Sequence, residues 1–403
     1  MRSRLAVCAN AVCAIVVLSI RAHAQQLLPN IPVAPFARPT GPFAVGSYDW
    51  LWVDERRSEI YTKDPSDKRK LPITVWYPAE AIAGAQPASY VRRLAEFGPN
   101  SPLSALSAVK THATLGAPVA KAQRKYPVLV YSHGAGWPRF SATFLTEELA
   151  SHGYVVFAID HPGLDQTVSF SDGTSFHADT LRPSPPDPKQ APLVSAQQTL
   201  EFLNAVDFPV WIADSRFVLD QIEALDQAPG PFRGRLDLDR IGILGWSFGG
   251  ATALEMLRTD PRVKAAVNHD GRLFGGVTSE PIGRPFMMFH HGGDDTLAAP
   301  PATRPTTRTI VAMSRAIDSA ARARATADWY DVTLARTNHG HFSDLPLFLA
   351  LFSDTTLLPG TRAHAIINAY TLAFFDRYLK GQPSALLAGP APSFSEVIFR
   401  RRQ

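Results

Sequence analysis

The stretch DRIGILGWSFGGATAL, residues 239–254, places a serine where two dissimilar segments meet. Residues 241–244 are an apolar run typical of a buried strand, whereas residues 251–258 contain good helix formers with apolar side chains at helical spacing. Ser247 lies between them, with a glycine two residues to either side that allows the backbone to turn tightly. The stretch therefore predicts a strand, a sharp turn and a helix, with the serine hydroxyl exposed at the turn.

The pattern Gly-x-Ser-x-Gly in this setting is typical of a nucleophile elbow, in which a tight turn presents the serine hydroxyl at the end of a sheet. A glycine-rich turn with an incidental serine is the alternative interpretation. A serine hydroxyl becomes a good nucleophile only when a base accepts its proton, and a histidine base needs an acid that sets its tautomer. The elbow therefore predicts an acid and a histidine at later strand ends.

Two acids and two histidines occupy suitable positions after Ser247. Asp270 closes the apolar run VKAAVNHD, and Asp295 lies in HHGGDDTLAAP. His339 and His341 both lie in TNHGHFSD, after the last predicted strand. Because the order serine, acid, histidine is typical of α/β-hydrolases, the sequence offers two coherent triads, one with each acid.

Strands and helices alternate through most of the chain. The segment PVLVYSHG, residues 127–134, is a predicted strand, residues 142–153 are a helix that ends at a glycine, and YVVFAID is a second strand. The alternation predicts an α/β fold with a mostly parallel central sheet and helices on both faces. Further elements are an early antiparallel pair (48–53 and 73–77), strands at 263–270, 285–295 and 327–335, and helices at 307–324 and 363–381.

An insertion, residues 161–239, precedes the strand that leads to Ser247. It contains the proline-rich loop LRPSPPDPKQAP and an amphipathic helix around DSRFVLDQIEAL. In a hydrolase this position suits a cap that covers the substrate, and a purely structural insertion is the alternative. We expect residues 25–403 to form one domain with this probable cap insertion.

The first 24 residues have the features of an export signal. Residues 1–4 are basic, residues 5–20 are mostly apolar, and Ala22-His23-Ala24 predicts cleavage after Ala24. A retained anchor is the alternative, but the apolar run is shorter than the roughly 20 residues that span a bilayer. Cys8 and Cys13 are the only cysteines of the chain, so the secreted or periplasmic protein would contain no disulfide.

The net charge argues against a nucleic-acid partner. The chain has 40 Lys and Arg against 36 Asp and Glu, a formal net charge of +4. Arg2, Arg4 and Arg21 lie in the export signal, which contains no acidic residue, so the remaining chain is close to neutral. A nearly neutral chain lacks the excess of basic residues that is typical of nucleic-acid-binding proteins.

Several motifs together resemble the platelet-activating-factor acetylhydrolase family, in the branch that contains the plasma and type II intracellular enzymes and bacterial relatives. They occur in the same order as in the family: GPFAVGSYDWLWVD, ITVWYPAE, VLVYSHGAG, LASHGYVV, LDLDRIGILGWSFGGATA, AAVNHDG and HGHFSDLPL. The resemblance covers most of the chain after residue 24. It implies an α/β-hydrolase fold and a serine carboxylesterase that acts on short-acyl esters through an acyl-enzyme, with neither a metal nor an organic cofactor.

Carried over residue by residue, the resemblance makes Ser247 the nucleophile, Asp270 the acid and His339 the base. The backbone N–H groups of Ala135, in SHGAG, and of Phe248, directly after the nucleophile, would form the oxyanion hole. A small-molecule or lipid ester is the implied substrate, with transient contact to a lipid surface. The sequence leaves the oligomeric state open.

One departure from the family pattern supports a second candidate triad. Trp246 stands where the acetylhydrolases more often have histidine, and Gly-Trp-Ser-x-Gly-Gly also occurs in some cutinase-like bacterial polyester hydrolases. That pattern would use Asp295 and His341. The segments SHGAG and HGHFSD favour Asp270 and His339. A non-catalytic scaffold of the same fold is the alternative from a different functional class.

Other candidate residues have weaker signals. His290 and His291 are adjacent and so point to opposite sides of a strand, which favours structural or substrate-lining roles over metal binding. His133 either shapes the oxyanion loop or packs in the core. Four aromatic residues are candidates for an apolar acyl pocket, with a core position as the alternative: Trp137, Phe140, Trp211 and Phe217.

Overall fold

The computed structural model describes residues 31–92, 106–163, 167–177, 192–293 and 304–402. The predicted export signal, nearly all of the proline-rich loop and Asp295 lie outside the described residues. The helices of the described ranges include none long and apolar enough to cross a membrane.

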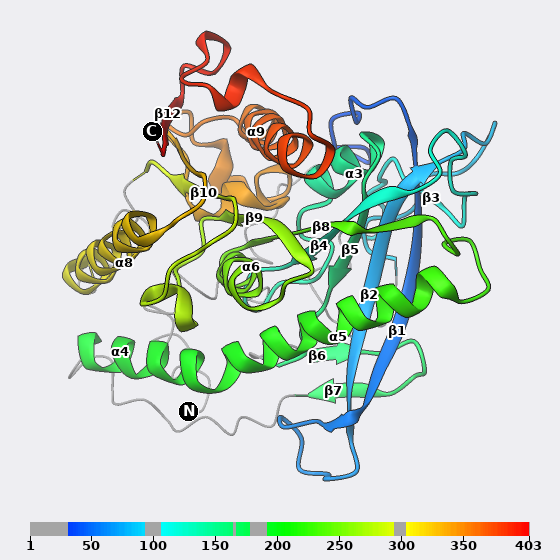
Figure 1. Ribbon diagram of the computed structural model, residues 1–403, viewed down its shortest axis with the longest axis horizontal. Helices are drawn as coiled ribbons and strands as arrows, with labels where there is room; N and C mark the ends of the chain where they lie inside the picture. The colour runs from blue at the N-terminus through cyan, green and yellow to red at the C-terminus, as the bar shows by residue number, and fades with distance from the viewer. Residues whose placement is uncertain (1–30, 93–105, 164–166, 178–191, 294–303, 403) are drawn as a thin grey trace.

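A ten-stranded mixed sheet forms the centre of the molecule, in the order β12-β11-β10-β9-β8-β4-β5-β2-β1-β3 (Figure 1). The six strands from β11 to β5 are mutually parallel, whereas β12, β2 and β1 each run antiparallel to a neighbour. The mostly parallel sheet is therefore confirmed. The strands are β1 (Ala44–Ser58), β2 (Lys68–Ala79), β3 (Thr114–Leu115), β4 (Tyr126–Ser132), β5 (Val155–Ile159), β8 (Leu236–Trp246), β9 (Val263–His269), β10 (Phe286–His291), β11 (Trp329–Leu334) and β12 (Val397–Arg401); β6 (Thr167–Ser169) and β7 (Ser175–His177) pair separately.

Helices cover both faces of the sheet. The cluster of buried residues on one face includes α5 (Phe208–Gln227) and α6 (Phe248–Thr259). The cluster on the other face includes α3 (Thr143–Ser151) and α9 (Gly360–Lys380). Figure 1 also shows α8 (Arg304–Arg324) on the side of the sheet that ends with β12. Both faces are thus buried, as the continuous apolar strands of the sequence predict.

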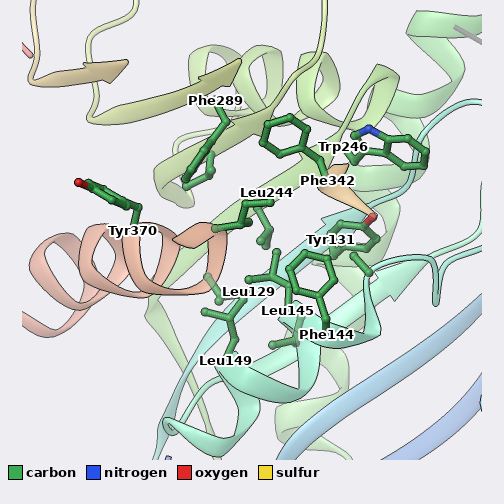
Figure 2. Packing of buried hydrophobic residues seen from close by; sticks show 14 of the residues in the cluster. Leu129, Tyr131, Phe144, Leu145, Leu149, Leu244, Trp246, Phe289, Phe342 and Tyr370 are labelled. Carbon is green, nitrogen blue, oxygen red and sulfur yellow. The ribbon is translucent and has the colours of Figure 1, made fainter. Parts of the chain in front are cut away.

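Successive residues of the central strands belong to the buried clusters on opposite faces of the sheet. Val128 and Val130 of β4 contact the α5 and α6 side, whereas Leu129 belongs to the cluster with α3 and α9. Figure 2 shows Leu129 and Leu244 of neighbouring strands packed with Leu145 and other side chains of α3. The period of two along each strand therefore places apolar side chains in two cores at once.

The predicted elements are found, but several are longer. In the early antiparallel pair, Ala44 pairs with Ala79 at one end and Ser58 with Lys68 at the other. In the insertion, α5 begins at Phe208, and a π-helical turn, Leu203–Asp207, joins it to α4 (Pro192–Phe202). Because α5 contributes Trp211, Val218 and Ile222 to the core, it is a layer of the fold, whereas the function of the insertion as a cap stays a prediction.

The helix α3 receives its N-terminal cap from a distant segment. Ala142, the residue before the helix, provides no side-chain acceptor. Instead Asp344 Oδ2 accepts the backbone N–H of Thr143 at 2.8 Å, and Asp344 Oδ1 accepts that of Phe144 at 3.2 Å, across 201 and 200 residues of sequence. The contact ties the segment after β11, which contains the candidate histidines, to the start of α3.

Candidate active site

Ser247 lies in the predicted sharp turn between β8 and α6. Its backbone has φ 57° and ψ −120°, a conformation that a non-glycine residue adopts only when its surroundings impose it. Gly249 allows the turn to pack against β4, because a Cβ atom there would lie 2.1 Å from the carbonyl oxygen of Ser132. The strained serine and the close backbone contact are the features of an elbow.

Asp270 follows β9 at the same edge of the sheet and accepts three hydrogen bonds. Its Oδ2 accepts from His339 Nδ1 and from His291 Nδ1, each at 2.6 Å, and its Oδ1 accepts the backbone N–H of His291 at 3.1 Å. Burial raises the pKa of this carboxyl, but the charge and hydrogen bond of His291 and the hydrogen bond of His339 outweigh it and hold the pKa well below its usual range. Asp270 is therefore an ionised acceptor between two imidazoles.

His339 begins a short 3-10 turn, His339–Phe342, after β11. The indole Nε1 of Trp246 donates to the carbonyl oxygen of His339 at 3.1 Å, and the two rings lie 5.2 Å apart between centroids. His339 and Ser247 line the same pocket, yet among the described residues no hydrogen bond joins the Ser247 hydroxyl to a side chain. Such contacts are often long before substrate binds.

His341 does not line the pocket and is buried. Its Nδ1 accepts the backbone N–H of Asn338 at 3.0 Å, and its Nε2 donates to the carbonyl oxygen of Leu358 at 3.0 Å. Burial lowers the pKa of His341 to about 4, so the ring is neutral near neutral pH. Both ring nitrogens serve the local fold, and Asp295, the other member of the second triad, lies outside the described residues.

The two predicted oxyanion donors belong to neighbouring backbone segments. Ala135 is buried in the loop after β4, and Phe248 is the first residue of α6. The backbone N–H of Gly249 donates to the carbonyl oxygen of His133 at 3.1 Å, which joins the loop to the serine turn. In the part of the chain that the structure describes, neither the Ala135 nor the Phe248 amide donates to a protein acceptor.

A buried polar network that the sequence patterns do not indicate supports the loop after β4, which contains the predicted oxyanion donor Ala135. His133 Nε2 accepts the backbone N–H of His161 at 3.1 Å, and His161 Nδ1 donates to Asp214 Oδ2 at 2.9 Å. Arg69 donates to both carboxylate oxygens of Asp214, at 3.0 and 2.6 Å. The His161 ring also stacks on Trp211 of α5, with centroids 4.0 Å apart. Helix α5 is thereby bonded to the loop that contains Ala135.

A pocket of about 90 Å³ opens beside the serine. Two aromatic side chains, Phe248 and Phe274, form part of its wall. The four aromatic residues considered for this role, Trp137, Phe140, Trp211 and Phe217, are instead buried in the two cores, and none lines this pocket. The lining residues are Leu200, Ser247, Phe248, Asp270, Gly271, Arg272, Phe274, His290, His291, Ile310, Val311, Ser314, Arg315, Asp318 and His339.

The adjacent histidines of β10 differ in their contacts. His291 bonds to Asp270, whereas His290 Nε2 lies 3.6 Å from Asp331 Oδ2 on the neighbouring strand. Asp270, His291 and His339 bring potential ligand atoms within 4.8 Å of one another, a spacing that would suit a metal ion. Both histidine Nδ1 atoms lie at hydrogen-bond distance from one carboxylate oxygen, which fits two N–H donors. The alternation along a strand predicts which side His291 faces, but not that Asp270 lies there.

Comparison with known proteins agrees with the resemblance drawn from the motifs. A family model described as "Platelet-activating factor acetylhydrolase, isoform II" matches residues 33–206. A "Probable 1-alkyl-2-acetylglycerophosphocholine esterase" of Arthroderma benhamiae is 26% identical over 68% of this chain and 66% of that protein. A "Platelet-activating factor acetylhydrolase" of Cavia porcellus is 25% identical over 63% of this chain and 59% of that protein. The chain therefore matches somewhat less than two thirds of the length of these relatives.

A solved structure matches almost the whole chain. The ferulic acid esterase from Streptomyces cinnamoneus superposes with a TM-score of 0.67 at 29% sequence identity, over 90% of this chain and 98% of the esterase. A second family model, described as "Alpha/beta hydrolase family", matches residues 128–396, which include β4, the serine turn and the segment around His339. This family model agrees with the strand order and with the turn at Ser247. The chain therefore belongs to the alpha/beta hydrolase family.

Proposed function

We propose that this protein is an exported serine hydrolase that cleaves short-acyl carboxylic esters through an acyl-enzyme. The observation that carries the proposal is the 2.6 Å hydrogen bond between His339 and Asp270 in the pocket that also contains Ser247. Relatives named as acetylhydrolases and esterases support the same reaction class. Export rests on residues 1–24, and transient contact with a lipid surface belongs to the proposal as well.

The proposed chemistry follows from the tautomer of His339 that the hydrogen bond to Asp270 sets. Because His339 Nδ1 donates to Asp270, its Nε2 is the nitrogen that accepts the proton of the Ser247 hydroxyl as that oxygen attacks the ester carbonyl. The backbone N–H groups of Ala135 and Phe248 stabilise the oxyanion. The imidazolium then protonates the departing alkoxide, and water, deprotonated by the same ring, hydrolyses the acyl-enzyme.

The pairing of Asp270 with His339 is favoured over that of Asp295 with His341. Both ring nitrogens of His341 are bonded to the backbone of its own region, and His341 does not line the pocket at Ser247. His339 has the carboxylate contact that sets the tautomer of a base.

The size of the pocket supports a short acyl group. A volume of about 90 Å³ is small for a ligand site. Phe248 and Phe274 provide apolar contact to such a group.

Hydrolysis of p-nitrophenyl acetate by the purified protein tests both the activity and the choice of acid. Asp270→Asn should lower kcat by up to about 10⁴-fold, because an amide supports the wrong histidine tautomer. Asp295→Asn is the matched control and should have a mild effect. The reverse ranking would contradict the proposed triad, and a wild-type protein that hydrolyses none of a panel of short esters would contradict the activity.

A further inference from the structure

We propose that the pocket beside Ser247 recognises a hydroxyl group on a short chain of the ester, which donates to the Asp318 carboxylate and accepts from the Arg272 guanidinium. The inference rests on the proposed function and names a substrate class for the same site. Both side chains line the pocket together with the serine.

Asp318 is a buried carboxyl group that forms no hydrogen bond within the described ranges. It lies on the face of α8 that also brings Ile310, Val311 and Ser314 to the pocket. Only 5% of the residue is exposed, and Oδ1 is fully buried, with no partner among the residues that the structure describes. The nearby Arg322 forms an ion pair with Asp331, with 2.7 Å between Nη1 and Oδ2, so its guanidinium is directed to another carboxylate. A buried acceptor of this kind costs free energy unless a ligand or water donates to it.

Arg272, in the loop after β9, supplies the complementary group, and its guanidinium lies against α8. It follows Asp270 by two residues, and its Nη1 donates to Ser314 Oγ at 2.7 Å and to the carbonyl oxygen of Ile310 at 3.3 Å. Within the described ranges it forms no ion pair. A guanidinium has five N–H donors, so others remain for a ligand. The pocket thus presents a donor and an acceptor that do not bond to each other.

A hydroxyl group complements this pair. It has one O–H donor, for the Asp318 carboxylate, and an oxygen that can accept from the Arg272 guanidinium. The volume of about 90 Å³ is small for a ligand site, which favours a small group as the carrier of the hydroxyl. A substrate without the hydroxyl would leave Asp318 unpaired in the complex, and sites built to bond a substrate hydroxyl discriminate strongly against analogues that lack it. The hydroxyl lies either on the acyl side or on the alcohol side of the ester.

Isosteric ester pairs distinguish the two sides. Ethyl β-hydroxybutyrate against ethyl isovalerate places hydroxyl or methyl on the acyl side, and hydroxyethyl butyrate against propyl butyrate does so on the alcohol side. The ratio of kcat/KM within a pair is the readout, because differences in the amount of active protein cancel. The wild-type enzyme should favour the hydroxylated member of at least one pair by about tenfold or more.

Variants of Asp318 test whether this residue is the source of the preference for the hydroxylated ester. Asp318→Leu should bring the ratio close to one, whereas Asp318→Asn should restore part of it, since an amide oxygen still accepts from the hydroxyl. Ser319→Ala, an exposed neighbour on the same helix that does not line the pocket, should leave the wild-type ratio unchanged.

Two results overturn the inference alone: a wild-type ratio near one in both pairs, or an unchanged preference in Asp318→Leu. A protein that hydrolyses none of the four esters, and does not react with a fluorophosphonate, would overturn the proposed function instead, and this inference with it.

Discussion

At the scale of residues, Asp270 is the most heavily bonded group of the site. One oxygen accepts from two imidazoles, and the other accepts a backbone amide. His291 therefore holds the same carboxylate oxygen as His339 and helps to keep the carboxyl group ionised. We regard His291 as a residue that positions the acid, without a role at the reacting atoms.

Replacing His291 by Phe should lower kcat/KM by about 10- to 100-fold, because a hydrogen bond to a charged group contributes roughly 1.5–3 kcal/mol. The folded-state pKa of Asp270 is depressed, partly by His291, so its loss should move that pKa upward. An NMR titration of the Asp270 carboxyl carbon in His291→Phe should therefore give a higher pKa than in the wild type. His291→Asn, which keeps a donor, should restore part of the shift, and an unmoved pKa in His291→Phe would indicate only a packing role.

The residues of the candidate site were predictable to different degrees. Ser247 follows from a local pattern, because strand, glycine turn and helix are contiguous in the sequence. Asp270 and His339 needed the resemblance, since the residues alone left Asp295 with His341 open, and their catalytic roles stay predictions. The contacts of Asp318 with the pocket were not predictable, because they depend on how α8 lies against the loop after β9.

At the scale of elements, the sequence predicts the type of an element better than its ends. The apolar periodicity of α5 is visible from residue 214, but the structure starts the helix at Phe208 and joins it to α4 through a π-helical turn. Pro209 stands just after the π-helical turn, where the regular hydrogen-bond pattern is already interrupted, so it does not end the helix. Figure 1 shows α4 and α5 as one long element along the side of the molecule.

The cap of α3 provides a test of an element held by a remote residue. Asp344→Ala removes the acceptor of two buried N–H groups, those of Thr143 and Phe144, so the free energy of unfolding should fall by about 1–3 kcal/mol. Asp354→Ala is the matched control, because Asp354 is exposed and bonds only to Thr356 in its own turn. Denaturant unfolding measures both. Equal stability of the two variants would show that the remote cap contributes nothing.

Helix α8 should contribute a pH dependence to stability through Asp318. Burial raises the pKa of Asp318 from its ordinary 3.8 to about 6. The folded state then binds more protons than the unfolded state between these values, so the contribution of Asp318 to stability falls as pH rises through this window. At about 1.4 kcal/mol per tenfold change, the cost above the window is at most about 3 kcal/mol.

Asp318→Asn should therefore be more stable than the wild type at about pH 8, by about 1–3 kcal/mol, and the two proteins should converge at about pH 4. Denaturant unfolding at both pH values gives the difference, in which the contributions of all other groups cancel. A variant that is less stable than the wild type at the higher pH would show that the ionised carboxylate is well solvated or paired in solution.

At the scale of the whole molecule, the parallel strands bring the candidate residues to one edge of the sheet. Ser247, Asp270 and His291 stand at or just after the carboxyl ends of β8, β9 and β10, which are neighbours in the sheet. In open α/β sheets, ligand sites lie outside these strand ends. The sheet and its two helical layers were predictable, because buried parallel strands read as continuous apolar runs. The buried Arg69, His161 and Asp214 network was not, since it joins segments far apart in the sequence.

Labelling with a fluorophosphonate probe tests the central claim most directly, because such a probe reacts only with an activated serine. Mass spectrometry of the digested wild-type protein should find the phosphonyl group on a single peptide, that of the elbow, and on Ser247 within it. Ser247→Ala should bind no probe while remaining folded by circular dichroism. A protein that hydrolyses esters but is labelled at another residue, or is not labelled at all, would contradict the account.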